Sequence, residues 1–440
     1  MILTQRLKTL LLLWGDIILF YVSLYLALLF RYRETPDIKL WANHQIPFLI
    51  IHILWIAIFY IGGLYDIKNF ASRKKIIESL LKTMSAAALL AVIIFYLTPS
   101  IPIAPKTNLL IDIVILTSLL VVWRRIFWSL ARAGSKIKLL FFGTSPDIDD
   151  LFQKILVNPQ LGYEPVGIID PSENDLSKLI KEKDIQLVIA SKQGLYDNEQ
   201  TRKLYNVMPL GVSITSFENF YESITERIPV NLINEMWFLE NLFEIKKRTF
   251  EIIKRGVDIF AALFLMIPLV LFFPFVWLLS KIESEDDIIV RQKRVGKNNR
   301  IFTLYKIRTM YKASDGKAVW ASEEDPRITK VGKFLRKTRL DELPQAINIL
   351  KGEMSFIGPR PERPEFVEAL EKEIPHYAMR HIIKPGATGW AQIKFPYGAS
   401  IQDATEKLQY DLYYIKNRSL VLDLAIAART IVTILSRGGR

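Results

Sequence analysis

The sequence contains no cysteine and only four histidines. The absence of cysteine excludes disulfides, thiolate metal sites and a cysteine nucleophile, and four histidines argue against a histidine-rich metal centre. Charge is also sparse, because 23% of the 440 residues are charged whereas 50% are hydrophobic. This composition argues against a disordered chain and against an ordinary soluble enzyme. The net charge is +13, which favours anionic membrane surfaces or phosphate-bearing substrates as partners.

Four apolar runs of membrane length occupy the first third of the chain, at about 10–30, 46–64, 80–98 and 108–130. A helix of about 20 apolar residues crosses a bilayer core, so we predict a four-helix transmembrane bundle over 1–135. Buried core helices of a soluble protein are the alternative. Lysine and arginine concentrate before the first run, between the second and third, and after the fourth. This pattern predicts that both ends of the bundle lie in the cytoplasm.

Residues 136–235 have a soluble composition in which short apolar segments alternate with helical ones. Strands are expected at 137–142, 166–170, 185–190 and 212–215. Such alternation predicts a small Rossmann-like α/β domain with a parallel sheet. The turn after the first strand keeps one glycine, Gly143, of the three in the nucleotide-binding pattern G-x-G-x-x-G. We therefore favour a structural domain over a nucleotide site.

A fifth apolar run, at 252–279, has Pro268 near its middle. Proline removes a helix hydrogen bond and clashes with the preceding turn, so a break or kink is predicted there. Basic residues flank the run on both sides, which favours a re-entrant helix that returns to the side from which it entered. A kinked helix that spans the bilayer is the alternative.

The segment RQKRVGKNNRIFTLYKIRTM, at 291–310, predicts two strands joined by a turn at 296–299. Lys306 and Arg308 are then expected on one face of the second strand, where two cations suit a diphosphate. A solvated basic hairpin near anionic lipid is the alternative.

The segment RKTRLDELPQ, at 336–345, places Asp341 and Glu342 just before a helix that begins near Pro344. A helix N-terminus favours anions such as phosphate. Adjacent carboxylates point in different directions, so one can attack phosphorus while the other holds a metal ion. The alternative is that both merely cap the helix.

The segment GEMSFIGPRPERPE, at 352–365, holds Arg360 between two prolines. Their fixed φ angles restrain the backbone around a planar, bidentate phosphate donor. Downstream, Arg380 belongs to a basic stretch that continues into a Gly- and Pro-containing loop. Trp390 and Tyr397 would either stack on a base or sugar or lie at the membrane interface.

Together these segments resemble the bacterial sugar transferase domain, that of the monotopic phosphoglycosyl transferases that act on polyprenyl phosphate. Two further segments carry the resemblance, KPGATGWAQI at 384–393 and KLQYDLYYIKNRSLVLDL at 407–424. The whole chain resembles the long form of the family, of the exopolysaccharide biosynthesis type. This form places a four-helix bundle and a Rossmann-like domain ahead of a catalytic domain, here 246–440, with a re-entrant helix at 252–279.

The resemblance implies roles for individual residues. Asp341 is the implied nucleophile, Glu342 the implied Mg²⁺ ligand, and Pro268 the implied break of the re-entrant helix. The cations expected to contact substrate phosphates are Lys306, Arg308, Arg336, Arg360 and Arg380. One departure is visible: Ile267 stands where the family often has serine, so one hydroxyl partner for the carbonyls freed by the proline is missing.

The implied reaction transfers a sugar-1-phosphate from a UDP-sugar to polyprenyl (undecaprenyl) phosphate through a covalent aspartyl intermediate and releases UMP. It would be the first membrane step of exopolysaccharide or other surface glycan synthesis. Expected partners are the two substrates and membrane lipids, with no nucleic acid, and a homodimer fits the long form. The expected location is the bacterial inner membrane, with the catalytic domain on the cytoplasmic face. An inactive membrane scaffold or regulator, and a transporter-like or polyprenyl-phosphate-binding protein, are the alternatives.

Overall fold

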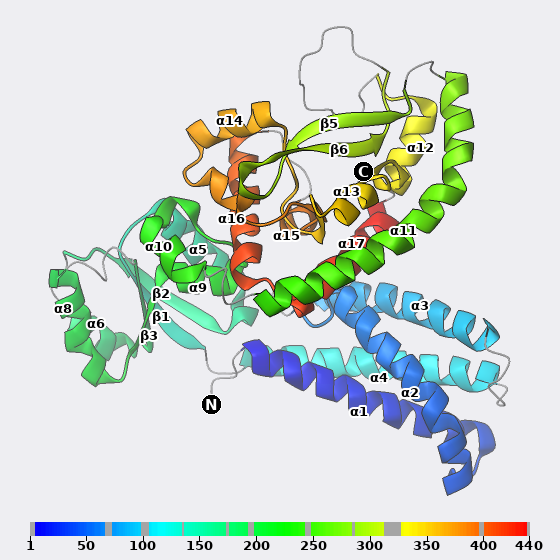
Figure 1. The fold of residues 1–440 in the computed structure, drawn as a ribbon. Coiled ribbons are helices and arrows are strands. Elements are labelled where there is room, and N and C mark those ends of the chain that lie inside the picture. The colour runs from blue at the N-terminus through cyan, green and yellow to red at the C-terminus, as the bar shows by residue number, and fades with distance from the viewer. Residues whose placement is uncertain are drawn as a thin grey trace. The chain divides into compact units, whose positions relative to one another are not determined.

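The computed structural model describes residues 5–66, 73–97, 105–133, 136–172, 176–191, 198–242, 248–283, 287–311, 327–395 and 400–437 (Figure 1). Its contacts divide the chain into two compact units, residues 1–217 and 218–440. The first contains the N-terminal helices and a parallel sheet, and the second contains the segments that carry the candidate site residues.

The four apolar runs at the N-terminus form four long helices, which confirms this part of the prediction. They are α1 (Gln5–Tyr32), α2 (Ile38–Ile61), α3 (Arg73–Leu97) and α4 (Pro105–Ala133). Their shared core includes the fully buried aromatic side chains of Phe20, Phe48, Trp55 and Phe59. The outer surfaces also carry large apolar side chains, such as Trp14, which is 60% exposed. Within the described residues, α1, α2 and α3 are among the helices long and apolar enough to cross a membrane.

The predicted parallel sheet is confirmed, with strand order β2-β1-β3-β4. The strands are β1 (Ile137–Phe142), β2 (Tyr163–Ile169), β3 (Leu187–Ala190) and β4 (Ser213–Ser216). The segments between them contain α5 (Pro146–Val157), η2 (Pro159–Leu161), α6 (Leu176–Lys183), α8 (Asn198–Val207) and η3 (Met208–Leu210). Strand β1 is apolar along its buried part, as expected for a strand of a parallel sheet that is covered on both faces.

The helix α11 (Arg248–Glu283) contains the fifth apolar run. It is one continuous helix of 36 residues with Pro268 and Pro274 inside it, and it bends along its length in Figure 1. The prolines therefore curve the helix without interrupting it. Large apolar side chains such as Phe260, 75% exposed, and Phe275, 68% exposed, line its surface. This helix also has the length and composition to cross a membrane, and the re-entrant path remains a prediction.

The remaining elements of the second unit are short, except for two C-terminal helices. Preceding α11 are α9 (Phe217–Thr225), which leads into this unit, η4 (Val230–Leu232) and α10 (Glu235–Asn241). Following it are β5 (Ile289–Val295), η6 (Lys297–Asn299), β6 (Ile301–Ile307), α12 (Lys330–Thr338), η7 (Leu340–Glu342), α13 (Gln345–Lys351), β7 (Ser355–Ile357), α14 (Pro364–Glu373), η8 (Tyr377–Ile382), β8 (Gly386–Thr388), α15 (Trp390–Lys394), α16 (Ile401–Asn417) and α17 (Leu420–Arg437).

The hairpin predicted at 291–310 is present. Strands β5 and β6 pair antiparallel, and Asn298 and Asn299 at the turn take φ angles of 54° and 59°. Asparagine tolerates this left-handed conformation better than most residues, which explains the two asparagines in the turn.

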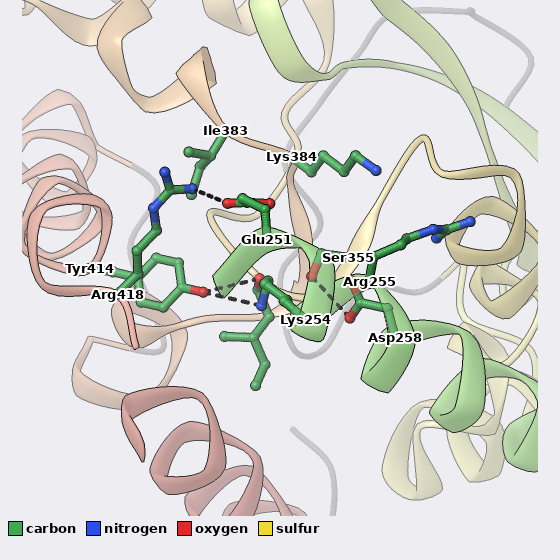
Figure 2. Close-up of a pocket in the computed structure, with 10 residues that line it drawn as sticks. Glu251, Lys254, Arg255, Asp258, Ser355, Ile383, Lys384, Tyr414 and Arg418 are labelled. Carbon is green, nitrogen blue, oxygen red and sulfur yellow. Dashed lines mark hydrogen bonds and ion pairs between the residues drawn. The ribbon is translucent and has the colours of Figure 1, made fainter. Parts of the chain in front are cut away.

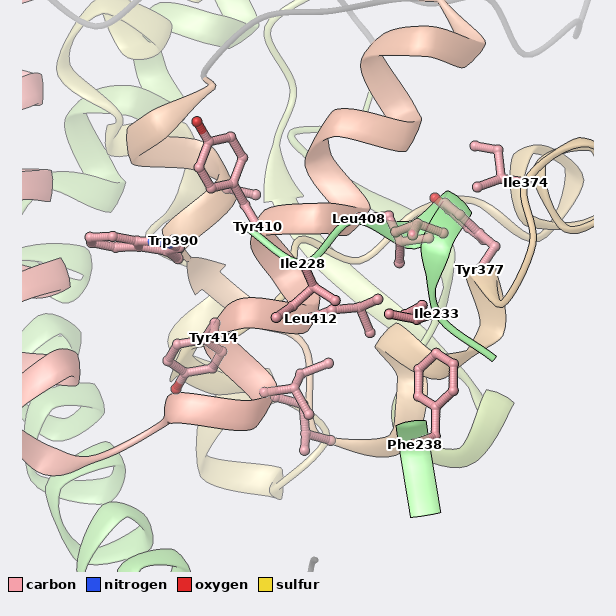
Figure 3. Packing of buried hydrophobic residues seen from close by; sticks show 14 of the residues in the cluster. Ile228, Ile233, Phe238, Ile374, Tyr377, Trp390, Leu408, Tyr410, Leu412 and Tyr414 are labelled. Carbon is pink, nitrogen blue, oxygen red and sulfur yellow. The ribbon is translucent and has the colours of Figure 1, made fainter. Parts of the chain in front are cut away.

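The largest core of this unit surrounds α16 (Figure 3). Leu408, Leu412 and Tyr414 of α16 are each at most 1% exposed. They pack in one cluster with Ile228 and Phe238, which precede α11 in the chain. Segments far apart in sequence thus hold α16 in place, and α16 in turn carries Asp411, a residue that supports the candidate site.

Candidate active site

Lys306 lies at the end of β6, on the strand face that also carries Phe302 and Leu304. Those two side chains pack against Ala346 and Ile349 of α13. Because Phe302 and Leu304 pack against α13, Lys306, which is the next residue on this face of β6, lies near the start of that helix. Lys306 Nζ lies 2.7 Å from an oxygen of Asp341.

The carboxylates of Asp341 and Glu342 lie in the single turn η7, between α12 and α13. Arg339, with φ 58°, ends α12 in the left-handed conformation and turns the chain toward this pair. The turn is followed directly by α13, whose N-cap is Pro344. The sequence prediction that the two acids precede a helix is therefore confirmed.

Three cations surround the carboxylate of Glu342. Its Oε1 atom lies 3.1 Å from Nη2 of Arg360, 3.4 Å from Nη1 of Arg339 and 3.7 Å from Nζ of Lys306. The site thus contains three positive side chains against two negative ones, Asp341 and Glu342. The excess positive charge suits a substrate with several phosphate oxygens.

The two acids differ in their electrostatics. Burial raises the pKa of Asp341, whose side chain is 1% exposed, and the charge of Lys306 opposes this rise. Burial would also raise the pKa of Glu342, but Arg360, Lys306 and Arg339 outweigh it and lower that pKa to about 2. Among the described residues, the buried Oδ1 of Asp341 has no hydrogen-bond partner. One oxygen of Asp341 is therefore held by Lys306 while the other is left to react or to bind a ligand.

Arg360 follows β7, and the side chain of Arg380 forms a hydrogen bond with its backbone. Nη2 of Arg380 donates to the carbonyl of Arg360 at 3.1 Å and to Asp411 at 2.7 Å, and its Nη1 donates to the hydroxyl of Tyr377 at 2.6 Å. The side chains of Arg380 and Asp411 are 5% and 2% exposed. This buried network fixes the loop that carries Arg360. Arg380 therefore acts on the site by positioning the backbone of Arg360.

The remaining predicted site residues make other contacts. Nε of Arg336 donates to the Thr309 hydroxyl at 3.0 Å, which ties α12 to the end of the hairpin. Arg308 follows β6 and donates to the carbonyl of Asp287 at 2.6 Å. Trp390 is buried and stacks on Tyr413, so it is part of the core rather than of a ligand or membrane surface. Tyr397 lies outside the described residues.

The structure brings together Lys306, Asp341, Glu342 and Arg360, and it adds residues that sequence reasoning missed. Arg339 was visible in RKTRLDELPQ, two residues before the nucleophile candidate, but its contact with Glu342 depends on a left-handed turn. Asp411 lies 31 residues from Arg380 in sequence. Its signal was an acidic residue within the mostly aromatic and apolar segment LQYDLYYI of α16.

Comparisons with known proteins cover the part of the chain that contains this site. A profile described as "Bacterial sugar transferase" matches residues 249–437, which includes every predicted site residue. The chain is 43% identical over 232 residues, 52% of its length, to the UDP-N-acetylgalactosamine-undecaprenyl-phosphate N-acetylgalactosaminephosphotransferase of Aeromonas hydrophila. It spans about half of that relative's length, 53%.

Two further relatives cover larger shares of one or both chains. A UDP-glucose:undecaprenyl-phosphate glucose-1-phosphate transferase of Klebsiella pneumoniae is 31% identical over 325 residues, which are 68% of this chain and 67% of that one. The exopolysaccharide production protein PSS of Rhizobium leguminosarum bv. phaseoli is 38% identical over 194 residues, which are 42% of this chain and 97% of the relative. The chain described here belongs to the bacterial sugar transferase family.

Proposed function

We propose that the protein transfers a sugar-1-phosphate from a UDP-sugar to polyprenyl phosphate, with Asp341 as the nucleophile. The observation that carries this proposal is the buried carboxylate of Asp341, paired at one oxygen with Lys306 and unpartnered at the other among the described residues. The names of the relatives, which include undecaprenyl-phosphate phosphotransferases, support the acceptor and the reaction class.

In the first step, Oδ1 of Asp341 forms a bond to the β-phosphorus of the sugar nucleotide. The bond from that phosphorus to the bridging oxygen breaks, and UMP leaves with the bridging oxygen. In the second step, an oxygen of polyprenyl phosphate attacks the same phosphorus and the carboxylate of Asp341 is released. The product is a polyprenyl-diphosphate-sugar.

Lys306, Arg339 and Arg360 provide the positive charge that both steps need. Lys306 favours the ionised form of Asp341 and so opposes the effect of burial, and the arginines neutralise the phosphate oxygens on which negative charge accumulates. Arg336 and Arg308 are bound within the hairpin region, and Arg380 within its own network. We infer that these three arginines position the site and do not contact the phosphate directly.

The residues present fit a magnesium ion held jointly with substrate. Magnesium takes one or two carboxylates together with phosphate oxygens and water. Asp341 and Glu342 are two adjacent carboxylates, and the ion pairs of Glu342 with the three cations all involve its Oε1 atom, which leaves its Oε2 atom outside those pairs. We propose that Glu342 holds the ion, which when bound would neutralise charge on the diphosphate.

The two substrates place this chemistry at the membrane surface. A sugar nucleotide cannot enter the bilayer, and a polyprenyl chain cannot leave it without exposing apolar surface. The apolar, exposed surface of α11 supports a catalytic unit attached to the membrane. We assign this catalytic unit to the cytoplasmic face of the bacterial inner membrane. The basic residues that flank α11 favour retention of both ends of this helix on that face.

The test uses the purified full chain with undecaprenyl phosphate and a panel of UDP-sugars, and measures UMP. Asp341→Asn should abolish UMP release, whereas Asp287→Asn, a matched change at an exposed aspartate, should leave it unchanged. With the preferred UDP-sugar and no acceptor, the peptide that contains Asp341 should gain the mass of a sugar phosphate. Lipid-linked product that still forms in the asparagine variant would reject this nucleophile, and no turnover by the parent with any sugar would favour the scaffold alternative.

A further inference from the structure

A second cluster of charged residues surrounds a small cavity between the start of α11 and the segments that pack on it (Figure 2). Each of its acidic side chains already has a partner. Glu251 pairs with Arg418 at 2.5 Å, and Asp423, which lies beside the cavity, pairs with Lys254 at 2.5 Å. Asp258 accepts from the Ser355 hydroxyl at 3.1 Å and from the Phe356 amide at 2.9 Å.

Arg255 and Lys384 are the cations of this cluster that lack an acidic partner among the residues that the structure describes. Arg255 donates to the carbonyls of Ile349 and Leu350, the last turn of α13, at 2.5 and 2.8 Å. Within the described part of the chain, neither cation lies within 4.0 Å of a carboxylate. Figure 2 shows both side chains extending on the same side, away from the pair formed by Glu251 and Arg418.

The two cations converge on the turn at Gly352. A Cβ atom placed on this glycine would lie 3.6 Å from Nη2 of Arg255 and 3.6 Å from Nζ of Lys384. Gly352 has φ 82°, and the missing side chain leaves the space between the cations open. Burial, and then the neighbouring charge of Arg255, lower the pKa of Lys384. An anion between the two cations would relieve their repulsion.

The surroundings indicate what kind of anion fits. Exposed apolar side chains flank the cluster in sequence on both α11 and α17: Ile252 is 65% exposed, Val257 54%, Val421 70% and Leu424 69%. A free inorganic ion gains nothing from such neighbours, whereas an anion attached to acyl chains buries them. Basic groups beside exposed apolar surface are the usual features of a lipid headgroup site.

We propose that Arg255, Lys384 and the turn at Gly352 bind the phosphate of an anionic membrane phospholipid. The helix α13 separates this site from the Asp341 carboxylate, which lies before the helix, whereas Gly352 lies after it. The site is therefore distinct from the one at which phosphoryl transfer is proposed, and it does not depend on that proposal.

The test measures lipid binding to the purified full chain in neutral detergent by native mass spectrometry. The probes are phosphatidylglycerol, phosphatidylcholine and undecaprenyl phosphate, with inorganic phosphate as competitor and no sugar nucleotide. Lys384→Gln removes one charge-assisted contact and should weaken phosphatidylglycerol binding about tenfold. Lys293→Gln, a matched change at an exposed lysine of β5, should have no effect. Arg255→Lys retains the charge and should weaken binding less than Lys384→Gln.

Each of the following outcomes would overturn the proposal. Equal phosphatidylglycerol binding by the parent and Lys384→Gln would remove the site. Equal binding of phosphatidylcholine would show that acyl chains alone are recognised. Loss of the lipid on addition of millimolar inorganic phosphate would assign the site to a free anion, and preferential retention of undecaprenyl phosphate through Lys384 would assign it to the acceptor.

Discussion

Nζ of Lys306 lies 2.7 Å from Oδ2 of Asp341, and this ion pair joins the β5–β6 hairpin to the turn that carries both acids. The carboxylate is buried to 1% exposure, so the lysine supplies the positive charge that favours its ionised form. The proposed nucleophile therefore depends on a residue 35 positions earlier in the sequence.

Lys306→Met should lower UMP release about 100-fold and change its pH dependence. Burial raises the pKa of Asp341 and Lys306 opposes the rise, so removing the lysine raises this pKa further. The nucleophile is active when ionised, so the acid limb of kcat/KM should move to higher pH. The pH profile of initial rates tests this, with Lys293→Met as the control. An acid limb that does not move would separate Lys306 from the ionisation of Asp341.

Glu342→Gln should raise the Mg²⁺ concentration needed for half-maximal activity by at least about tenfold, because the amide is a weaker ligand for magnesium than a carboxylate. The measurement is UMP release across a Mg²⁺ titration. Glu365→Gln, at the exposed start of α14, is the matched control. A variant that loses rate at every Mg²⁺ concentration, with the same midpoint as the parent, would contradict the ligand role and leave Glu342 as a partner of the arginines.

Asp411→Asn should lower kcat/KM about as much as Arg380→Gln, although neither side chain contacts the two site acids. Each change leaves a buried group without its partner, at a cost of about 3–5 kcal/mol. The double variant should lose less than the sum of the single losses. Thermal unfolding and kinetics of all four proteins test this cycle. Additive kinetic losses, with Asp411→Asn nearly normal, would instead favour direct phosphate contact by Arg380.

Gly332→Ala should destabilise the catalytic unit by about 1–3 kcal/mol, because a Cβ there would overlap the backbone carbonyl of Thr309. Gly256 is the matched control: a Cβ on this glycine of α11 meets nothing within 4 Å. Gly256→Ala should be neutral or stabilising, since alanine favours helix more than glycine does. Unfolding midpoints of the two variants in detergent provide the comparison. Equal midpoints would show that α12 can move away from the hairpin.

The re-entrant path of α11 can be tested by single cysteines, because the chain has no background thiol. Thr249→Cys and Lys281→Cys lie near the two ends of the helix. Both should react with a membrane-impermeant maleimide only after the cytoplasmic face is exposed. Reaction of the two cysteines from opposite faces would establish a spanning helix and refute the re-entrant path.

Much of the fold follows from sequence patterns that act locally. Apolar runs predict the long helices, alternation predicts the parallel sheet, and the turn at Asn298 and Asn299 predicts the hairpin. The end of β6 near Lys306 and the start of α13 were also predictable. These two positions bring Lys306 and the two acids into one region. Arg360 was predictable from the prolines on either side of it.

The remaining features depend on contacts that sequence spacing does not encode. The interaction of Arg380 with Asp411 requires η8 and α16 to pack together, so a basic residue that seems available for substrate is instead buried. Arg336 shares a motif with the acids, yet its side chain turns to Thr309. Pro268 predicts a disturbance in α11, but the extent of the bend depends on how the neighbouring turns adjust.

The contact of Arg255 with the last carbonyls of α13 has a mechanical consequence. One end of this seven-residue helix is attached to α11, and the proposed nucleophile precedes its other end. The helix is too short to flex appreciably, so it acts as a spacer of fixed length. A displacement of α11 along the bilayer normal is thus transmitted to the carboxylate of Asp341, so the proposed nucleophile would keep one height relative to α11 whatever the thickness of the surrounding bilayer.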